Sequence, residues 1–268
     1  MRYPSAAWKP SPNSTDGRAS QRVDAVCLHI TEGPLGREFD SAVSWFQNPN
    51  SAVSAHFVLS EAGAVAQCVD TDDTAYAQGL GYYAKGARNW PAKWTWQGVG
   101  WYTARGKRVE PTWKLIKAPI NPNSRIVSIE NAGQHGTPRT PAQMTALLAL
   151  LGWLGGQYPQ LLPYVPGKTL IGHFMLDPLD RANCPGPHIN LDAIAAAANA
   201  QPHGTYIISG LPIYSDSQLT VLSGRRLTFG QKVSIDRVHA DQPADYAPSA
   251  AHLGDGSGFI DLNGAVKV

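Results

Sequence analysis

The sequence predicts a mixed α/β domain over residues 1–200, followed by a small all-β module over residues 204–268. In the first part, short apolar runs typical of buried strands alternate with segments of helical periodicity. Residues 199–204 have the composition of a linker, and the texture changes after them. The last part consists of short strand-like stretches separated by Gly and polar turns, which is typical of a small β-barrel. These stretches are residues 205–208, 219–222, 226–229, 232–235 and 258–262.

The strands of the first domain are predicted from short apolar runs bounded by turn residues. Residues 22–31 are rich in branched apolar side chains and end before a Gly-Pro pair, so they predict a buried strand. Residues 55–60 and 64–69 predict a β-hairpin with a tight turn. Residues 125–130 predict a further buried strand. Between the first strand and the hairpin, apolar residues at helical spacing predict a helix over residues 38–47.

A longer helix is predicted to begin after Thr140. Thr140 is a favourable N-cap, Pro141 suits the first helical position, and Gln143 would complete a capping box. The apolar residues that follow predict one face toward the core: Met144, Leu147, Leu148, Leu151 and Leu154. Residues 168–174 predict another strand, and residues 191–200 a small Ala-rich helix.

Residues 82–117 interrupt this pattern and predict a long functional insertion. The segment contains five tryptophans, and between Lys85 and Lys117 it has eight basic residues against one acidic residue. Indole rings offer broad apolar faces to a sugar polymer, and basic side chains pair with carboxylates. Trp94 and Trp96 are therefore candidate substrate-binding residues. The alternative is that several of these tryptophans pack a long loop onto the domain.

Composition excludes several classes of protein. A net charge of +2 does not favour a nucleic-acid-binding protein. No apolar run has the length of a membrane span, and the first residues lack the apolar core of a secretory signal. Three cysteines, Cys27, Cys68 and Cys184, are too few for a disulfide framework. Cys27 and Cys68 are expected to be core thiols.

Three candidate metal ligands lie at strand ends or in the turns after them. His29 lies near the end of the first strand, His173 at the end of a later strand, and Cys184 eleven residues further on. Two His and one Cys suit Zn²⁺ and leave a fourth position open for water. Spacing alone leaves the alternative of ordinary buried histidines and a buried thiol.

Five short motifs in a fixed order resemble the type 2 N-acetylmuramoyl-L-alanine amidase family, which is similar to peptidoglycan-recognition proteins. The resemblance covers residues 22–198, and a weaker one relates residues 204–268 to a bacterial SH3-type wall-binding module. The five motifs are Cys27-Leu28-His29-Ile30-Thr31, Ser54-Ala55-His56-Phe57-Val58-Leu59 with Gly63 and Gln67, Ser128-Ile129-Glu130, Gly172-His173 and Asn183-Cys184-Pro185.

The resemblance implies a central mixed sheet flanked by helices, with zinc held by His29, His173 and Cys184 in a surface groove. It also implies that Glu130 is the general base. Many members carry Lys or Thr two residues before the Cys, where this chain has Ala182. Either Arg181 takes over in stabilising the oxyanion, or zinc does so alone.

The implied reaction is hydrolysis of the amide between N-acetylmuramic acid and L-alanine in peptidoglycan. Combined with an SH3-like module, it suggests a phage endolysin, made in the host cytoplasm and released to the wall through a holin. The alternatives are a cellular recycling or remodelling amidase, a non-catalytic peptidoglycan-binding protein and a structural zinc protein.

Overall fold

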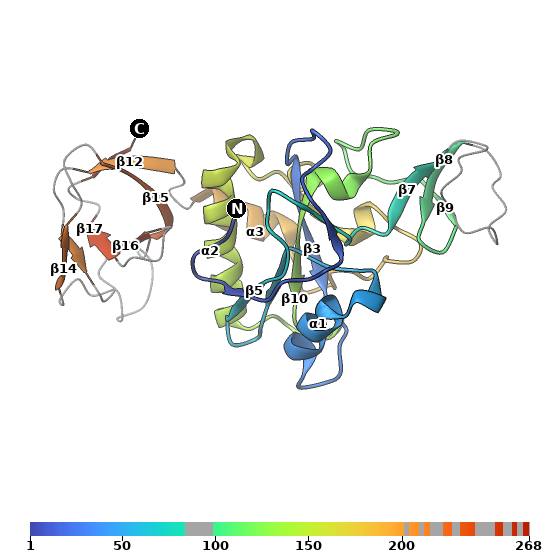
Figure 1. Ribbon diagram of the computed structural model, residues 1–268, viewed down its shortest axis with the longest axis horizontal. Helices are drawn as coiled ribbons and strands as arrows, with labels where there is room; N and C mark the ends of the chain where they lie inside the picture. The colour runs from blue at the N-terminus through green and yellow to red at the C-terminus, as the bar shows by residue number, and fades with distance from the viewer. Residues whose placement is uncertain are drawn as a thin grey trace.

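The computed structural model describes residues 1–83 and 99–200 in full, and the backbone of seven strands between residues 204 and 267 (Figure 1). The first domain is built on a six-stranded sheet in which β4, β10, β3 and β11 run parallel, and β5 is antiparallel to β4. The mixed sheet is therefore confirmed. Its strands, in spatial order, are β1 (Ala7–Trp8), β5 (Val65–Gln67), β4 (Phe57–Leu59), β10 (Ile126–Asn131), β3 (Ala25–Ile30) and β11 (Leu170–Gly172).

Helices cover this sheet from both sides (Figure 1). The main core packs α2 (Pro141–Gln157) and α3 (Leu191–Ala200) on one face, and α1 (Glu38–Gln47) packs on the other. Side chains alternate across a strand, so Val26 and Leu28 of β3 face α2 while Cys27 faces away from it. His29 has the same parity as Cys27. The sheet therefore presents His29 on the face opposite α2.

Helix α2 begins as predicted, but its first turn and its burial differ from expectation. Thr140 is the N-cap, because its Oγ1 accepts the Gln143 N–H at 3.0 Å. The capping box is wrong. The Gln143 side chain turns into the core, where its Nε2 donates to the carbonyls of Leu59 (3.1 Å) and Ala132 (2.9 Å). The prediction of a single apolar face is also wrong, because α2 is buried on more than one side. Besides the sheet, α3 and η3 (Pro159–Leu161) pack on it.

The predicted insertion begins in a small antiparallel sheet of β7 (Leu80–Tyr83), β8 (Gly100–Thr103) and β9 (Arg108–Val109), and residues 110–117 follow this sheet. Trp101 and Trp113 are buried, and the Trp113 indole N–H donates to the Lys168 carbonyl at 2.7 Å. These two tryptophans therefore pack the segment onto the domain. Trp94 and Trp96 lie outside the described residues.

Short elements complete the first domain. β2 (Ser14–Thr15) pairs with β6 (Thr74–Ala75), and three 3-10 turns are η1 (Pro49–Ser51), η2 (Pro122–Arg125) and η4 (His173–Met175). The predicted hairpin is confirmed, with Gly63 in its turn at φ +84°. In the part of the chain that the structure describes, no helix has the length and apolarity needed to cross a bilayer.

The C-terminal region forms a seven-stranded sheet whose strand pairs are antiparallel. Strands at 205–208 and 232–235, and one within 258–262, are confirmed. The break expected between residues 222 and 226 is wrong, because residues 222–226 form one strand. Residues 219–221 and 227–229 lie outside the described residues. An SH3-like barrel stays a prediction. The strands are β12 (Gly204–Ile208), β13 (Pro212–Tyr214), β14 (Leu222–Arg226), β15 (Gln231–Val238), β16 (Ala250–Leu253), β17 (Phe259–Asp261) and β18 (Ala265–Lys267).

Candidate metal centre and groove

Three of the predicted site residues meet at the carboxyl ends of neighbouring parallel strands. Glu130 of β10 lies opposite His29 of β3 in the register of the sheet. His173 directly follows β11, which pairs with β3 on its other side. The strand ends at Gly172, so His173 begins the turn η4 and is not the last strand residue. Crevices at the carboxyl ends of parallel strands are common ligand sites.

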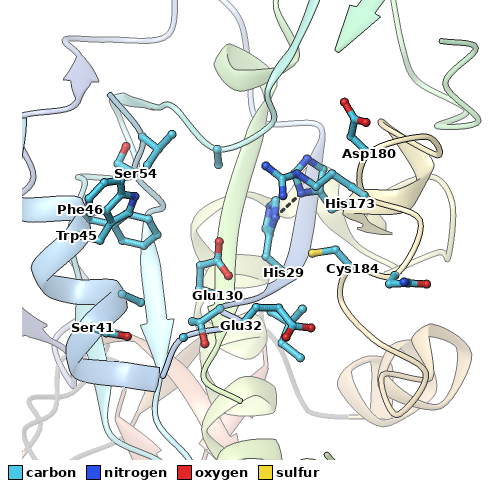
Figure 2. Close-up of a pocket in the computed structure, with 18 of the residues that line it drawn as sticks. His29, Glu32, Ser41, Trp45, Phe46, Ser54, Glu130, His173, Asp180 and Cys184 are labelled. Carbon is cyan, nitrogen blue, oxygen red and sulfur yellow. Dashed lines mark hydrogen bonds between the residues drawn. The ribbon is translucent and has the colours of Figure 1, made fainter. Parts of the chain in front are cut away.

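Cys184 joins this group from a loop. One ring nitrogen of His29, one of His173 and the Cys184 sulfur all lie within 4.8 Å of one another. The two histidine Nδ1 atoms are 2.9 Å apart (Figure 2). The Ile30 N–H donates to the Cys184 sulfur. The structure thus brings together three residues that the sequence separates by up to 155 positions, from 29 to 184.

The hydrogen bonds of His173 determine which of its nitrogens is free. Its Nε2 lies 3.0 Å from the Gln78 carbonyl, which can only accept, so Nε2 carries the proton and Nδ1 presents a lone pair. The Gln78 peptide is itself held, because Asn123 Oδ1 accepts the N–H groups of Ala77 (3.1 Å) and Gln78 (2.9 Å). A carbonyl partner on the second ring nitrogen is typical of histidine metal ligands.

The donor set fits Zn²⁺. Two imidazole nitrogens and one thiolate suit a borderline-soft cation, whereas Mg²⁺ and Ca²⁺ prefer oxygen. His29 Nε2 and Glu130 Oε2 are both buried without a hydrogen-bond partner among the described residues. Buried polar atoms are normally paired, so these two unpaired atoms are available to interact with a ligand.

Burial keeps the three donors neutral in the absence of a cation. It lowers the pKa of His173 to about 4 and that of His29 well below 6.5, where the neighbouring His173 adds to the effect. Burial likewise raises the pKa of the Cys184 thiol to about 12, against the Ile30 N–H, which lowers it. A bound dication reverses the preference of the thiol and favours the thiolate.

Glu130 combines a buried atom with access to the groove. The residue is partly exposed, yet its Oε2 is fully buried. Burial raises its pKa to about 7, and the positive charge of Arg181 opposes that rise. A carboxyl group with a pKa near neutrality is suited to general acid–base catalysis at physiological pH.

A groove of about 630 Å³ opens over these residues and has two unlike walls. Trp45, Val53 and Tyr76 form an apolar wall, and each is more than a third exposed. Figure 2 shows Glu130 between the Trp45 side and the His29, His173 and Cys184 cluster. Trp45 was not predicted from the sequence, because its exposure depends on which face of α1 is buried.

The opposite wall is polar and is tied to the small sheet. Asp180, Arg181 and Asn183 line it. Asp180 pairs with Lys107 at 2.5 Å and accepts from Thr103 Oγ1 at 3.0 Å. The β8–β9 turn is thereby joined to the segment that carries Cys184.

Cys27, Cys68 and His56 are buried and make structural contacts. Cys27 and Cys68 are buried free thiols, as expected. His56 is fully buried, and its Nδ1 accepts the Ser128 N–H at 3.0 Å, which ties the hairpin to β10. Ala55 beside it is buried and apolar and offers no group for proton transfer, whereas Glu130 lines the groove.

Comparison with known proteins identifies the family. "N-acetylmuramoyl-L-alanine amidase A" of Achromobacter lyticus is 34% identical over 98 residues, which are 32% of this chain and 53% of that protein, so the match spans about half of the relative. A crystal structure of an AmpD derivative is 20% identical, with a TM-score of 0.49, over 72% of this chain and 94% of that chain. A mutant endolysin from Bacillus subtilis is 13% identical, with a TM-score of 0.45, over 72% of this chain and 97% of that chain. Residues 19–187, well over half of the chain, match the Amidase_2 model, and the chain therefore belongs to that family, described as N-acetylmuramoyl-L-alanine amidase.

Proposed function

We propose that this protein is a zinc-dependent amidase that cleaves the bond between N-acetylmuramic acid and L-alanine in bacterial peptidoglycan. One observation carries the proposal. In a chain of this family, His29, His173 and Cys184 converge beside Glu130 on the floor of one open groove. The set has three protein donors, as catalytic zinc sites do, whereas structural sites close with a fourth.

The residues have distinct roles in amide hydrolysis. Bound Zn²⁺ supplies Lewis acidity, which activates water and polarises the scissile carbonyl. Glu130 takes the proton from the attacking water and returns it to the departing amine of L-alanine. Arg181 lies at the groove, close enough for its positive charge to act on both Glu130 and His173. This charge limits the rise that burial causes in the pKa of Glu130, and it adds to the lowering that burial causes in the pKa of His173. We assign it to the carbonyl oxygen as negative charge develops there.

The two walls of the groove match the two halves of the substrate. Sugar rings have apolar faces that pack on aromatic side chains, which suits the Trp45 and Tyr76 wall. The peptide stem carries amide and carboxylate groups, which suit the polar side chains of the opposite wall. Trp94 and Trp96 remain candidate substrate-binding residues.

The mass of the released fragments tests the proposal directly. Purified walls incubated with the full chain are expected to release stem peptides with a free L-alanine amine and to leave intact glycan. Chelation should stop the release, and added Zn²⁺ should restore it. Cleavage within the glycan or within the peptide, or full activity after metal removal, would show that the assignment is wrong.

A biological role in host lysis is part of the same proposal. An endolysin is expected to clear intact sacculi, and its C-terminal strands are expected to retain the protein on insoluble walls. A recycling enzyme would instead prefer small soluble muropeptides. Comparing the rates on sacculi and on a soluble muramyl peptide separates the two roles.

A further inference from the structure

We infer that Arg139 is a positioning residue that holds the Cys184 segment, and with it the sulfur donor, against the loop that follows β10. The inference rests on the proposed metal site. His29 belongs to a central strand and His173 follows one directly, whereas Cys184 lies in a loop without regular structure. Something other than a sheet ladder must therefore hold the sulfur in place.

Arg139 bridges the two loops through backbone carbonyls. Its Nη1 donates to the Ala132 carbonyl at 3.3 Å, on the loop after β10. Its Nη2 donates to the carbonyls of Gln134 and Pro185, each at 3.5 Å. Pro185 directly follows Cys184, so one guanidinium spans the segment after the proposed base and the segment of the proposed sulfur ligand.

Two glycines leave the space that this guanidinium occupies. Gly133 has φ +140°, and a Cβ added there would lie 2.1 Å from Arg139 Nη1. Gly186 has φ +99°, and its Cβ would lie 3.0 Å from the His135 carbonyl and 3.6 Å from Arg139 Nη2. Each loop therefore has a residue without a side chain where the arginine passes, and both glycines adopt backbone conformations that other residues rarely adopt.

The same two loops are joined by two histidines and anchored on α2. His135 Nδ1 lies 3.0 Å from the Asn183 carbonyl, and His188 Nε2 lies 3.2 Å from the Gly136 carbonyl. Arg139 itself directly precedes the N-cap of α2, and Gln143 in the first turn binds the Ala132 carbonyl at 2.9 Å. The start of a buried helix thus serves as the fixed point for the Cys184 segment.

The chemistry of the site calls for arginine at this position. A guanidinium is planar and offers five donors in a fixed fork, so it can bond carbonyls of two loops at once. A lysine ammonium has its three donors on one nitrogen, so it spans carbonyls of two loops less well than the guanidinium fork. Groups that orient metal ligands typically change metal affinity about 10- to 100-fold when altered.

The test measures zinc affinity of the full chain by competition with a chromogenic chelator. Arg139→Lys is expected to weaken zinc binding about 10- to 100-fold. In protein loaded with Co²⁺, the thiolate-to-cobalt charge-transfer absorption should weaken, because the sulfur is the donor that is released. A merely structural role would lower the unfolding temperature of the metal-free protein and leave this absorption unchanged.

Arg125→Lys is the matched control. Arg125 is also held by hydrogen bonds, to Asp24 at 2.7 Å and to the Leu115 carbonyl at 2.8 Å, but it contacts neither loop. It should lower the stability of the metal-free protein and keep the zinc affinity of the parent. If Arg139→Lys fails to fold, Gly186→Ala separates the loops without removing the guanidinium and should also weaken zinc binding.

The outcomes separate this inference from the proposed function. Zinc affinity of Arg139→Lys, or of Gly186→Ala, within about threefold of the parent would overturn the positioning role. A parent chain that takes up no zinc overturns both the positioning role and the metal centre. A parent that binds zinc through Cys184 but cleaves no wall amide contradicts the proposed function alone.

Discussion

Replacing Glu130 with Gln should separate the two demands on this residue, catalysis and stability. Removing a general acid–base group typically costs 10²- to 10⁴-fold in rate, which corresponds to about 2.7–5.4 kcal/mol of transition-state stabilisation. Glu130 Oε2 has no hydrogen-bond partner among the described residues, so no such partner of that atom is lost. The variant should therefore lose most amidase activity and keep its zinc.

The same change should stabilise the metal-free protein at alkaline pH. Burial raises the Glu130 pKa from 4.5 to about 7, so the native state binds more protons than the unfolded state in that interval and stability falls as pH rises through it. This pKa difference corresponds to a loss of about 3 kcal/mol in the free energy of unfolding above pH 7, and Gln, which does not ionise, avoids the loss. Urea unfolding of chelator-treated protein at pH 8 should show Glu130→Gln to be the more stable form.

Glu110→Gln serves as the control for both measurements. Glu110 is 82% exposed and follows β9 outside the groove, so its loss should change neither activity nor stability. Wild-type wall digestion by Glu130→Gln would refute its role as the base. A drop in stability at pH 8 would refute the reasoning from burial.

Three further predictions concern Gln143, His56 and the stabilising effect of zinc. Gln143→Leu removes one donor from each of the buried carbonyls of Leu59 and Ala132, and urea unfolding should show a loss of about 0.5–1.5 kcal/mol per hydrogen bond; unchanged stability would mean that the Ala132 N–H and Arg139 Nη1, which also bond these carbonyls, suffice. Burial, aided by the nearby Arg18 charge, lowers the pKa of His56 below 6.5, so its contribution to stability is present above pH 6.5 and is lost as pH falls. The free energy of unfolding should therefore decline less between pH 7 and pH 5 in His56→Gln than in the parent, and parallel curves would contradict this. Zinc at about 100 times its dissociation constant should stabilise the native state by about 2.7 kcal/mol over chelated protein, seen as a higher unfolding temperature; equal temperatures would argue against the metal centre.

The sequence predicted those helices and strands well whose formation depends on residues close together in the chain. The helix at residues 38–47 and the hairpin around Gly63 follow from apolar spacing and a turn glycine, both of which are local properties. The direction of the Gln143 side chain was not predictable in this way. A capping box and a pair of bonds to Leu59 and Ala132 use the same amide, and only the distant strand ends decide between them.

The candidate site was predicted as a set of residues, without the contacts that orient them. The residues His29, His173 and Cys184 could be found because they carry donor side chains at strand ends and in recognisable motifs. Gln78 and Arg139 could not, because their contacts use backbone carbonyls, and backbone atoms leave no trace in residue type. Trp45 could not be found from the sequence either, because its exposure depends on which face of α1 is buried.

The wide spacing of the three donors makes metal uptake a late event in the life of the chain. His29 and His173 are 144 positions apart, and Cys184 follows eleven positions later. A chain still short of residue 184 during synthesis, or clipped before it, holds at most two of the three donors. Once all three have met, one ion closes a loop that includes most of the domain and restricts its unfolded state. Zinc content at the proposed site would thus report whether a molecule is folded with all three donors in place.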